Sequence, residues 1–397
     1  MVREWEVLMK KTQLILLVIV IFAMLVACGK ETLPEVPESV LEPLKLHLED
    51  NEMSPSDYIL SQYEDKDIVF LGEYHRITHD LELVHELIPK LYEAGVYTLG
   101  IEFACASDQE KIDSLLNSDV YDQELANEIL YNWGVYWGYE EYLDIYKITW
   151  ELNQTLEADQ KKFRIVGLDA KEDYSYFQTD EDWDNQELKA KAYAEGNRDI
   201  VMARTVMSEI VDKEEKALIY SGINHAITKF KQPFYDKETN EVIRFNNERM
   251  GNIIYDAIGE RCMTIFLHSP WYGLDYEMVY PVDGVIDVLM KTHQQYPIGF
   301  DVVDSPFGNL IADTSEWATA YEDFKLSDYC DGYIFTKPIS EYEGVSYQEG
   351  FINSKNLADA TLNFPNTEIK QRKMSIATFK RLANSDANIK KRFKKFE

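Results

Sequence analysis

The sequence is poor in cysteine, in histidine and in positive charge. Four cysteines among 397 residues are too few for a scaffold held by disulfides. The 40 lysines and arginines are outnumbered by 71 acidic residues, giving a formal net charge of −31. A chain this acidic repels phosphate backbones, which excludes nucleic acid as a general partner. The aromatic content of 13% supplies material for a packed core, so a disordered chain is not expected either.

One long apolar run, from Leu14 to Ala27, follows a pair of lysines near the start of the chain. It is shorter than the ~20 residues that a membrane-spanning helix needs. The pattern is typical of a signal peptide over residues 1–27. Its last residues and the following cysteine, LVAC, resemble the lipobox of bacterial lipoproteins. This resemblance implies lipidation of Cys28 and a protein held on the extracytoplasmic side of the cell membrane, with an uncleaved signal anchor as the alternative.

The rest of the chain divides into three parts. Residues 28–50, which contain three prolines among glutamates, are expected to form an extended tether. Residues 51–365 are expected to form one large α/β domain. Residues 366–397 are basic and are interpreted as a solvated surface helix or frayed tail, with a membrane-binding patch as the alternative. Three cysteines follow the lipobox, and an odd number predicts at least one free, buried thiol.

Short apolar segments alternate with segments of helical spacing. Strands are predicted at 67–73, 97–103, 163–169, 216–221, 262–268, 298–303 and 332–336. Helices are predicted at 81–94, 107–117, 122–132, 139–157, 249–258 and 285–294. Strands that are apolar on both faces, with amphipathic helices between them, are typical of an α/β fold whose largely parallel central sheet is covered by helices on both faces.

Polar residues gather where the predicted strands end. Ligands of such sheets bind beyond the carboxyl ends of the strands, where the loops converge. The residues expected to meet at this rim are Glu73, His75, Arg76, His79, Glu102, Asp169, Asn224, His225 and His268. His85 lies on the following helix and is interpreted as a satisfied core histidine. The glycines in GEYH and GINH allow a close approach of the backbone at two of these strand ends.

Two mechanisms fit these residues. In the first, His75, Glu102 and His225 hold a divalent metal ion that activates water. In the second, His75 is a general base oriented by Glu73 or Glu102, because a carboxylate beside an imidazole fixes its tautomer.

The motifs also resemble those of a known superfamily, which comprises the erythromycin-esterase-like proteins, the ChaN-type haem-binding lipoproteins and the Tiki-type metalloproteases. LGEYH and GINH are similar to the first two motifs, and GIEF, VGLD and NRDIVMA follow in the order of the esterase branch. The resemblance implies that His75 acts as base with Glu73, Glu102 and His225 in support, and that Arg198 binds ligand. In the ChaN branch, His79 resembles a second histidine that binds haem.

The sequence therefore favours a membrane-anchored hydrolase that acts on an ester or amide of a small molecule. The alternative is a lipoprotein for the uptake of haem or iron. Six aromatic residues between 131 and 142, Trp137 among them, form either a pocket wall or ordinary helical packing. Their glycine neighbours favour a loop at this point.

Overall fold

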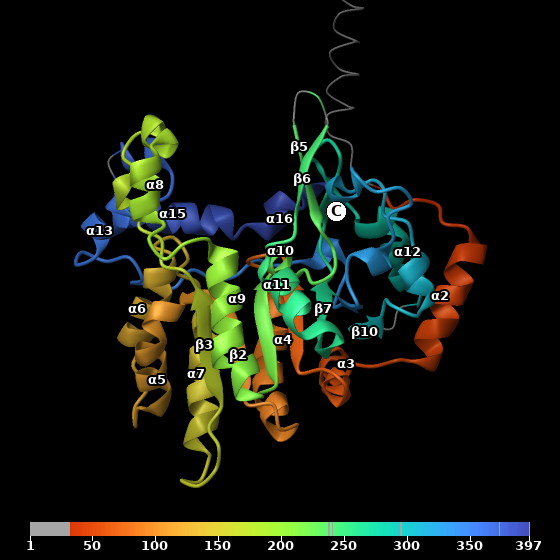
Figure 1. Ribbon diagram of the computed structural model, residues 1–397, viewed down its shortest axis with the longest axis horizontal. Helices are drawn as coiled ribbons and strands as arrows, with labels where there is room; N and C mark the ends of the chain where they lie inside the picture. Colours follow the sequence, from red (N-terminus) through yellow and green to blue (C-terminus); the bar gives the residue numbers. More distant parts are fainter. Residues whose placement is uncertain (1–31, 237–238, 240, 294–295, 373, 397) are drawn as a thin grey trace, which may run out of the picture.

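A seven-stranded sheet lies at the centre of the protein (Figure 1). The computed structural model describes residues 32–236, 239, 241–293, 296–372 and 374–396. The predicted signal peptide and Cys28 lie outside the described residues. The strand order is β10-β11-β7-β1-β4-β2-β3, and only the pairing of β10 with β11 is antiparallel. The strands are β1 Ile68–Glu73, β2 Thr98–Cys105, β3 Arg164–Asp169, β4 Ala217–Gly222, β7 Cys262–Leu267, β10 Ile298–Asp301 and β11 Gly332–Phe335.

Each predicted strand is present, within two residues at either end. Strand β1 shows why the sheet is buried on both sides. Val69 and Leu71 pack into one apolar cluster and Ile68 and Phe70 into another, because successive side chains point to opposite faces.

Helices cover both faces, as predicted (Figure 1). The helices are α2 Glu38–Asp50, α3 Pro55–Ser61, α4 Thr78–Glu93, α5 Gln109–Asn117, α6 Gln123–Trp133, α7 Glu140–Gln154, α8 Gln186–Ala192, α9 Arg198–Glu209, α10 Ile223–Ala226, α11 Met250–Ile258, α12 Val285–His293, α13 Leu357–Leu362, α14 Thr367–Lys370, α15 Ile376–Asp386 and α16 Ile389–Arg392. Helices α4 to α7 pack on one face, while α9, α11, α12 and α2 pack on the other. Two hairpins were not predicted: β5 Gln232–Tyr235 with β6 Val242–Asn246, and β8 Trp271–Tyr272 with β9 Met278–Val279.

The predicted extended tether is wrong for residues 38–50, which form α2. Leu41, Leu44 and Leu48 recur on one face of this helix and are buried against α12 and the loop near Phe307. Burial of this apolar face outweighs the presence of Pro43 inside the helix.

The basic C-terminal segment is also part of the fold. Phe379, Ala383 and Ala387 join the main apolar cluster, and Phe393 and Phe396 join a smaller one. The segment lies at the surface, as predicted, but only its outer side is solvated, because its inner side is buried against the domain. Figure 1 shows α15 and α16 lying across the end of the sheet at which α10 follows β4. The domain boundary predicted at residue 365 is therefore not a structural boundary.

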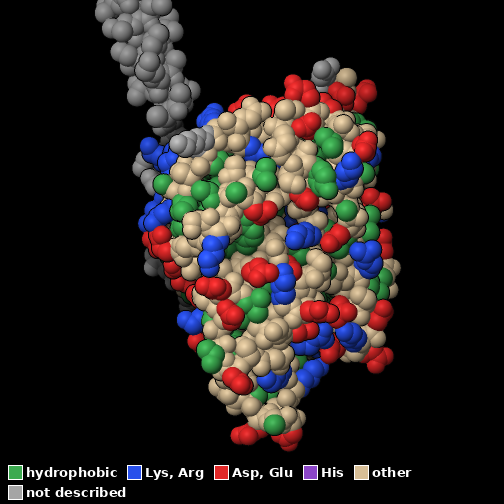
Figure 2. Space-filling model, turned by 90° about the vertical axis from the view of Figure 1, so that its left-hand side faces the viewer, with side chains coloured by type: hydrophobic (Ala, Val, Ile, Leu, Met, Phe, Trp, Pro, Cys, Tyr) green, Lys and Arg blue, Asp and Glu red, His purple; other side chains and the backbone are tan. Residues whose placement is uncertain are grey.

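The surface carries charge of both signs. On the face shown in Figure 2, acidic and basic side chains are interspersed, and hydrophobic side chains are scattered among them. Among the described residues, no helix has both the length and the apolar character needed to cross a membrane. Cys105, Cys262 and Cys330 are all free and buried, which confirms the prediction of a free thiol.

Candidate functional site

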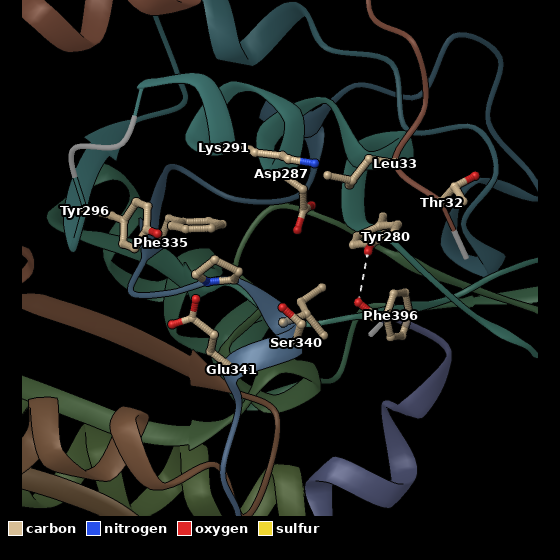
Figure 3. Close-up of a pocket in the computed structure, with 12 residues that line it drawn as sticks. Thr32, Leu33, Tyr280, Asp287, Lys291, Tyr296, Phe335, Ser340, Glu341 and Phe396 are labelled. Carbon is tan, nitrogen blue, oxygen red and sulfur yellow. Dashed lines mark hydrogen bonds between the residues drawn. The ribbon is translucent and has the colours of Figure 1, made fainter. Parts of the chain in front are cut away.

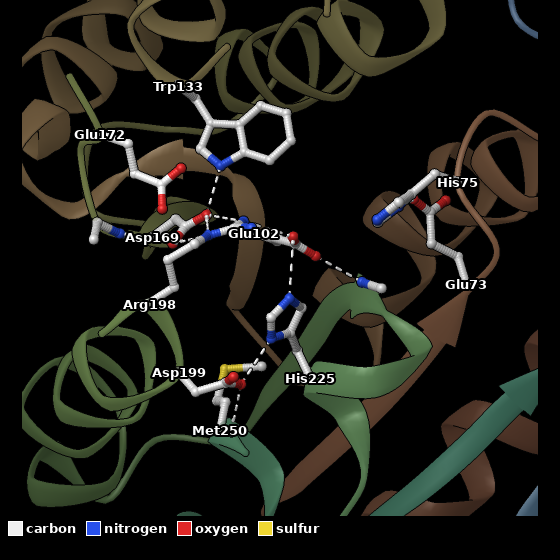
Figure 4. Close-up of polar contacts among 12 residues, drawn as sticks. Glu73, His75, Glu102, Trp133, Asp169, Glu172, Arg198, Asp199, His225 and Met250 are labelled. Carbon is white, nitrogen blue, oxygen red and sulfur yellow. Dashed lines mark hydrogen bonds and ion pairs between the residues drawn. The ribbon is translucent and has the colours of Figure 1, made fainter. Parts of the chain in front are cut away.

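The carboxyl ends of four adjacent strands bring the predicted residues together. Strands β1, β4, β2 and β3 lie side by side. Glu73 ends β1, Glu102 lies near the end of β2, Asp169 ends β3, and His225 follows β4 on the short helix α10. Figure 4 shows these side chains converging from their separate strands. The structure therefore brings these four predicted residues together, and the predicted residues His75 and Asn224 line the adjoining cavity.

Glu73 and His75 form a hydrogen-bonded pair. The Nδ1 atom of His75 lies 2.7 Å from Oε1 of Glu73, whose side chain is fully buried. Two hydroxyls, of Tyr142 and Tyr220, also donate to this carboxylate. Burial and the charge of Glu73 raise the pKa of both tyrosines, so the hydroxyls stay protonated and remain donors. Because Nδ1 donates to Glu73, the lone pair of His75 is on Nε2.

Nε2 of His75 faces Gly222, and the close contact explains why residue 222 is a glycine. A Cβ atom at residue 222 would lie 2.7 Å from Cε1 of His75 and 3.0 Å from Nε2. Only a residue without a side chain leaves room for the ring at this place. The close approach expected from the GINH motif is therefore present.

Glu102 is the centre of a second buried cluster. Arg198 donates from Nη2 to Oε1 of Glu102 at 2.8 Å, and the amide of Gly222 donates to Oε2 at 2.7 Å. Arg198 also binds Asp169 through Nε and Nη2, and Trp133 donates to Asp169 at 2.7 Å. Burial alone would raise the pKa of Glu102, but its cationic neighbours lower it to about 2. Glu102 is therefore an ionised acceptor.

His225 lies between two carboxylates. Its Nδ1 atom is 2.7 Å from Asp199, and its Nε2 atom is 3.5 Å from Glu102. Asp199 is held in turn by Arg249 and by the amide of Met250. Burial alone would lower the pKa of His225, but Glu102 and Asp199 raise it above the ordinary value. The two carboxylates therefore favour the protonated ring over the neutral one.

Arg76 is held in an unusual backbone conformation beside His75. Its φ of 72° is in the left-handed region, which non-glycine residues rarely adopt. The Arg76 amide donates to the Tyr142 hydroxyl at 3.0 Å, and the guanidinium lies 3.8 Å from the centre of the Trp137 ring. Trp137 is itself buried, so it both packs in the core and lines the site. The glycine-flanked segment between α6 and α7 is a loop, as predicted.

Two cavities meet at His75. One, of about 330 Å³, is lined by Glu73, His75, Asn224 and His225 together with Trp271 and Trp317. The other, of about 300 Å³, is lined by Glu102, Asp169 and Arg198 and by the rings of Trp133, Tyr136 and Trp137. His75 and Arg76 are in the walls of both. The site is therefore a cleft with His75 between its two halves.

His79 and His268 are not part of this cleft. Helix α4 begins at Thr78, earlier than predicted, which turns His79 into the core beside the Tyr342 ring. Burial lowers the pKa of His79 to about 3. His268 is buried as well, with its ring nitrogens bonded to Tyr333 and Asp287. His85 bonds to the Glu141 carbonyl at 2.8 Å, as expected of a satisfied core histidine.

A larger cavity, of about 800 Å³, lies elsewhere (Figure 3). Asp287, Lys291 and Glu341 are its charged wall residues, and Tyr296 and Phe335 are among its aromatic ones. None of the predicted site residues lines it.

The side chains of His75, Glu102 and His225 are each engaged by protein partners, and their role as metal ligands stays a prediction. Arg198 and the His225 imidazolium already supply positive charge to Glu102, and Nδ1 of His75 is bonded to Glu73. Within the described ranges, no three histidine, cysteine or acidic side chains are placed to hold a metal ion.

Several residues of the site were missed at the sequence level. They are Glu172, Tyr174, Tyr220, Trp317 and Arg392. Tyr142, Asp199 and Arg249 were part of the aromatic cluster and of the family motifs in the sequence, without a contact assigned to them. Tyr220 required knowledge that β4 lies beside β1.

The fold and the site define an α/β protein with an ionic cleft at the carboxyl ends of its strands. The family model described as "Haem-binding uptake, Tiki superfamily, ChaN" matches residues 59–196, which include Glu73, His75, Glu102 and Asp169. The resemblance inferred from the motifs is thereby confirmed. No curated protein matches the chain.

Three solved structures are similar to this chain at low sequence identity. A protein from Bacillus cereus is 11% identical, with a TM-score of 0.51 over 80% of this chain and 100% of that one. The erythromycin esterase EreC in its open conformation is 11% identical, with a TM-score of 0.49 over 79% of this chain and 98% of the esterase. ChaN of Campylobacter jejuni, solved with cofacial haem, is 13% identical, with a TM-score of 0.34 over 55% and 87% of the two chains.

Proposed function

We propose that the protein is a hydrolase that cleaves an ester or amide with water activated by His75. The observation that carries this proposal is the pair of Glu73 and His75, in which Nε2 is left as a free base facing the cleft. The His75 side chain is 33% exposed, so water and substrate can reach it. In the described part of the chain, His75 hydrogen-bonds to no hydroxyl or thiol that could serve as nucleophile. Water is therefore the nucleophile.

In the proposed reaction, the His75 imidazole acts first as a base and then as an acid. Nε2 removes a proton from water as the water oxygen attacks the carbonyl carbon, and a tetrahedral intermediate forms. Glu73 stabilises the resulting imidazolium through the bond to Nδ1. The intermediate collapses with cleavage of the C–O or C–N bond, and the imidazolium returns its proton to the leaving group.

Ordered ion pairs border the place where negative charge develops. His225 and the Arg198 guanidinium are held by Asp199, Glu102 and Asp169 before substrate arrives. We propose that an N–H group of the ordered Arg198 guanidinium donates to the carbonyl oxygen that becomes negative in the transition state.

The test is the variant His75→Ala, assayed against a panel of chromogenic esters and anilides. We expect kcat to fall by about a thousandfold or more, with the circular dichroism spectrum unchanged. The matched control is His47→Ala, a half-buried histidine on α2, which should keep full activity. Activity retained in His75→Ala would sink the assignment.

Haem binding is a second candidate, favoured by the match to the ChaN family model. His75 offers an accessible imidazole for iron, and Trp133, Tyr136 and Trp137 could flank a planar ring. His79 cannot serve in this conformation because it is 4% exposed. A shift of the haem Soret band on mixing, lost in His75→Ala, together with no turnover of any ester, would replace the hydrolase proposal by this one.

The proposal includes a lipid anchor on Cys28, supported by the lipobox at the end of the apolar run. Expression of the full chain with and without Cys28→Ala, followed by membrane fractionation, tests it. Equal membrane retention of the two forms would contradict lipidation.

A further inference from the structure

Three arginines line the cleft and a fourth, Arg249, lies beside it; two of the four have no acidic partner among the described residues. Arg198 and Arg249 form ion pairs with Glu102, Asp169 and Asp199. Arg76 and Arg392, by contrast, form no ion pair with any carboxylate of the residues described. Both line the same cavity of about 330 Å³ that holds Glu73, His75 and His225.

The two guanidiniums are held in place by neutral groups. Arg76 stacks on Trp137 and donates from Nε to the Tyr139 hydroxyl at 3.1 Å. Arg392 donates from Nη2 to the Asp386 carbonyl at 2.7 Å and from Nη1 to the Tyr74 hydroxyl at 3.4 Å. A guanidinium has five N–H groups, so each arginine keeps donors for a ligand. Because neutral groups fix them, their positive charges are not cancelled where they stand.

The two charges act on a common region. Burial raises the pKa of the Tyr139 hydroxyl, the charge of Asp386 adds to that rise, and the charges of Arg76 and Arg392 both oppose it. Both guanidiniums are therefore within electrostatic range of one hydroxyl group.

The acids of this cavity form no ion pair with the two arginines among the described residues. Glu73 accepts from His75 and from two tyrosines. Glu316, the other acid in the wall, forms no ion pair among the described residues, and burial raises its pKa.

We infer that Arg76 and Arg392 form an oxyanion-binding subsite, so that the substrate carries a carboxylate or phosphate group beside the bond that His75 cleaves. A planar guanidinium binds either anion with two parallel hydrogen bonds, and its charge strengthens them. Arg392 ends α16, which gives the packed basic C-terminal segment a role in recognising substrate. This inference rests on the proposed hydrolase and names its substrate class.

The test uses two esters that differ only in charge. Mono-para-nitrophenyl glutarate ends in a carboxylate, whereas para-nitrophenyl valerate has a methyl group at that position. We expect the protein to prefer the glutarate ester. Arg392→Gln should lower kcat/KM for the glutarate ester by about 10- to 100-fold, the effect of one charge-assisted hydrogen bond, and change that for valerate by less than about twofold. Arg392→Lys keeps the positive charge but loses the two parallel N–H donors of the guanidinium, so it should retain part of the preference for the glutarate ester.

The matched control is Lys391→Gln, the same change of charge on the neighbouring exposed residue. It should leave both esters unaffected. Equal losses for the two esters in Arg392→Gln, or equal losses in the control, would overturn the inference while the hydrolase proposal stands.

If the wild-type protein cleaves neither ester, the hydrolase proposal fails for these substrates, and binding decides the subsite. Glutarate is then titrated into the wild-type protein while the fluorescence of the cleft tryptophans is followed. Saturable binding weakened by Arg392→Gln but not by Lys391→Gln supports the anion subsite. The absence of any saturable signal overturns it.

Discussion

Glu73→Gln changes one buried charge and almost nothing of the shape of the site. The carboxylate accepts hydrogen bonds from His75 at 2.7 Å, from Tyr142 at 2.8 Å and from Tyr220. Glutamine keeps one acceptor oxygen for the tyrosines but removes the negative charge facing the imidazolium. Its NH₂ group can also donate to Nδ1, which would move the ring proton to Nε2 and abolish the base. The analogous Asp-to-Asn change in the serine-protease triad lowers kcat about 10,000-fold.

We therefore expect kcat of Glu73→Gln to fall by about 1,000- to 10,000-fold, or ~4–5.5 kcal/mol in the barrier. Because an unsatisfied buried group costs ~1–3 kcal/mol, urea unfolding should show a moderate loss of stability. Glu93→Gln removes the same charge from an exposed position on α4 and serves as the control. Single-turnover measurements on the best ester separate the chemical step from binding. A loss of kcat below about tenfold would show that Glu73 does not orient the base.

Three further variants test the rest of the structure. Gly222→Ala should lower kcat about tenfold or more, because the new Cβ would lie 2.7 Å from the ring of the proposed base. The fold should stay intact, because the φ of −56° at residue 222 suits alanine. Unchanged kinetics would contradict the close approach of His75 to Gly222. In the wild type, the raised pKa of His225 gives stability that is full below about pH 6.5 and is lost as pH rises through the folded-state value. Asp199→Asn should make that alkaline loss smaller, as measured by urea unfolding at several pH values; an unaltered pH dependence would argue against the ion pair. Leu44→Ala should lower the free energy of unfolding by ~2–5 kcal/mol. Leu46→Ala on the same helix should lower it little, because Leu46 is 51% exposed. Equal losses in the two variants would contradict the packing of α2 against the domain.

Local patterns were sufficient to predict the sheet but not every helix. The strands are short apolar runs with polar residues directly after them, so both their place and the rim were readable. Helix α2 was missed because Pro37 and Pro43 suggested extended chain, although Leu41, Leu44 and Leu48 already had helical spacing. Pro37 precedes the first helical residue, where a missing N–H is tolerated. Pro43 lies inside the helix, and burial of the three leucines offsets its cost.

The partners of the site depended on pairing between distant strands. The register of β1 with β4 sets Leu71 beside Tyr220 and Glu73 beside Gly222. Nothing local in the sequence places Tyr220 against Glu73, which is 147 residues away. The direction of the His79 side chain could not be predicted locally either, since it depends on whether α4 begins at Thr78 or three residues later.

The environments of the histidines separate their chemical roles. His225 is held as a cation by two carboxylates, and His79 and His268 are buried away from the cleft. His75 has one nitrogen fixed by Glu73 and the other facing the cleft. An enzyme site assigns acid and base by pushing similar groups into different protonation states. On that principle, we propose that the ion pairs around His225 and Glu102 fix the charges next to the cleft, and that His75 is the imidazole that exchanges a proton with a ligand there.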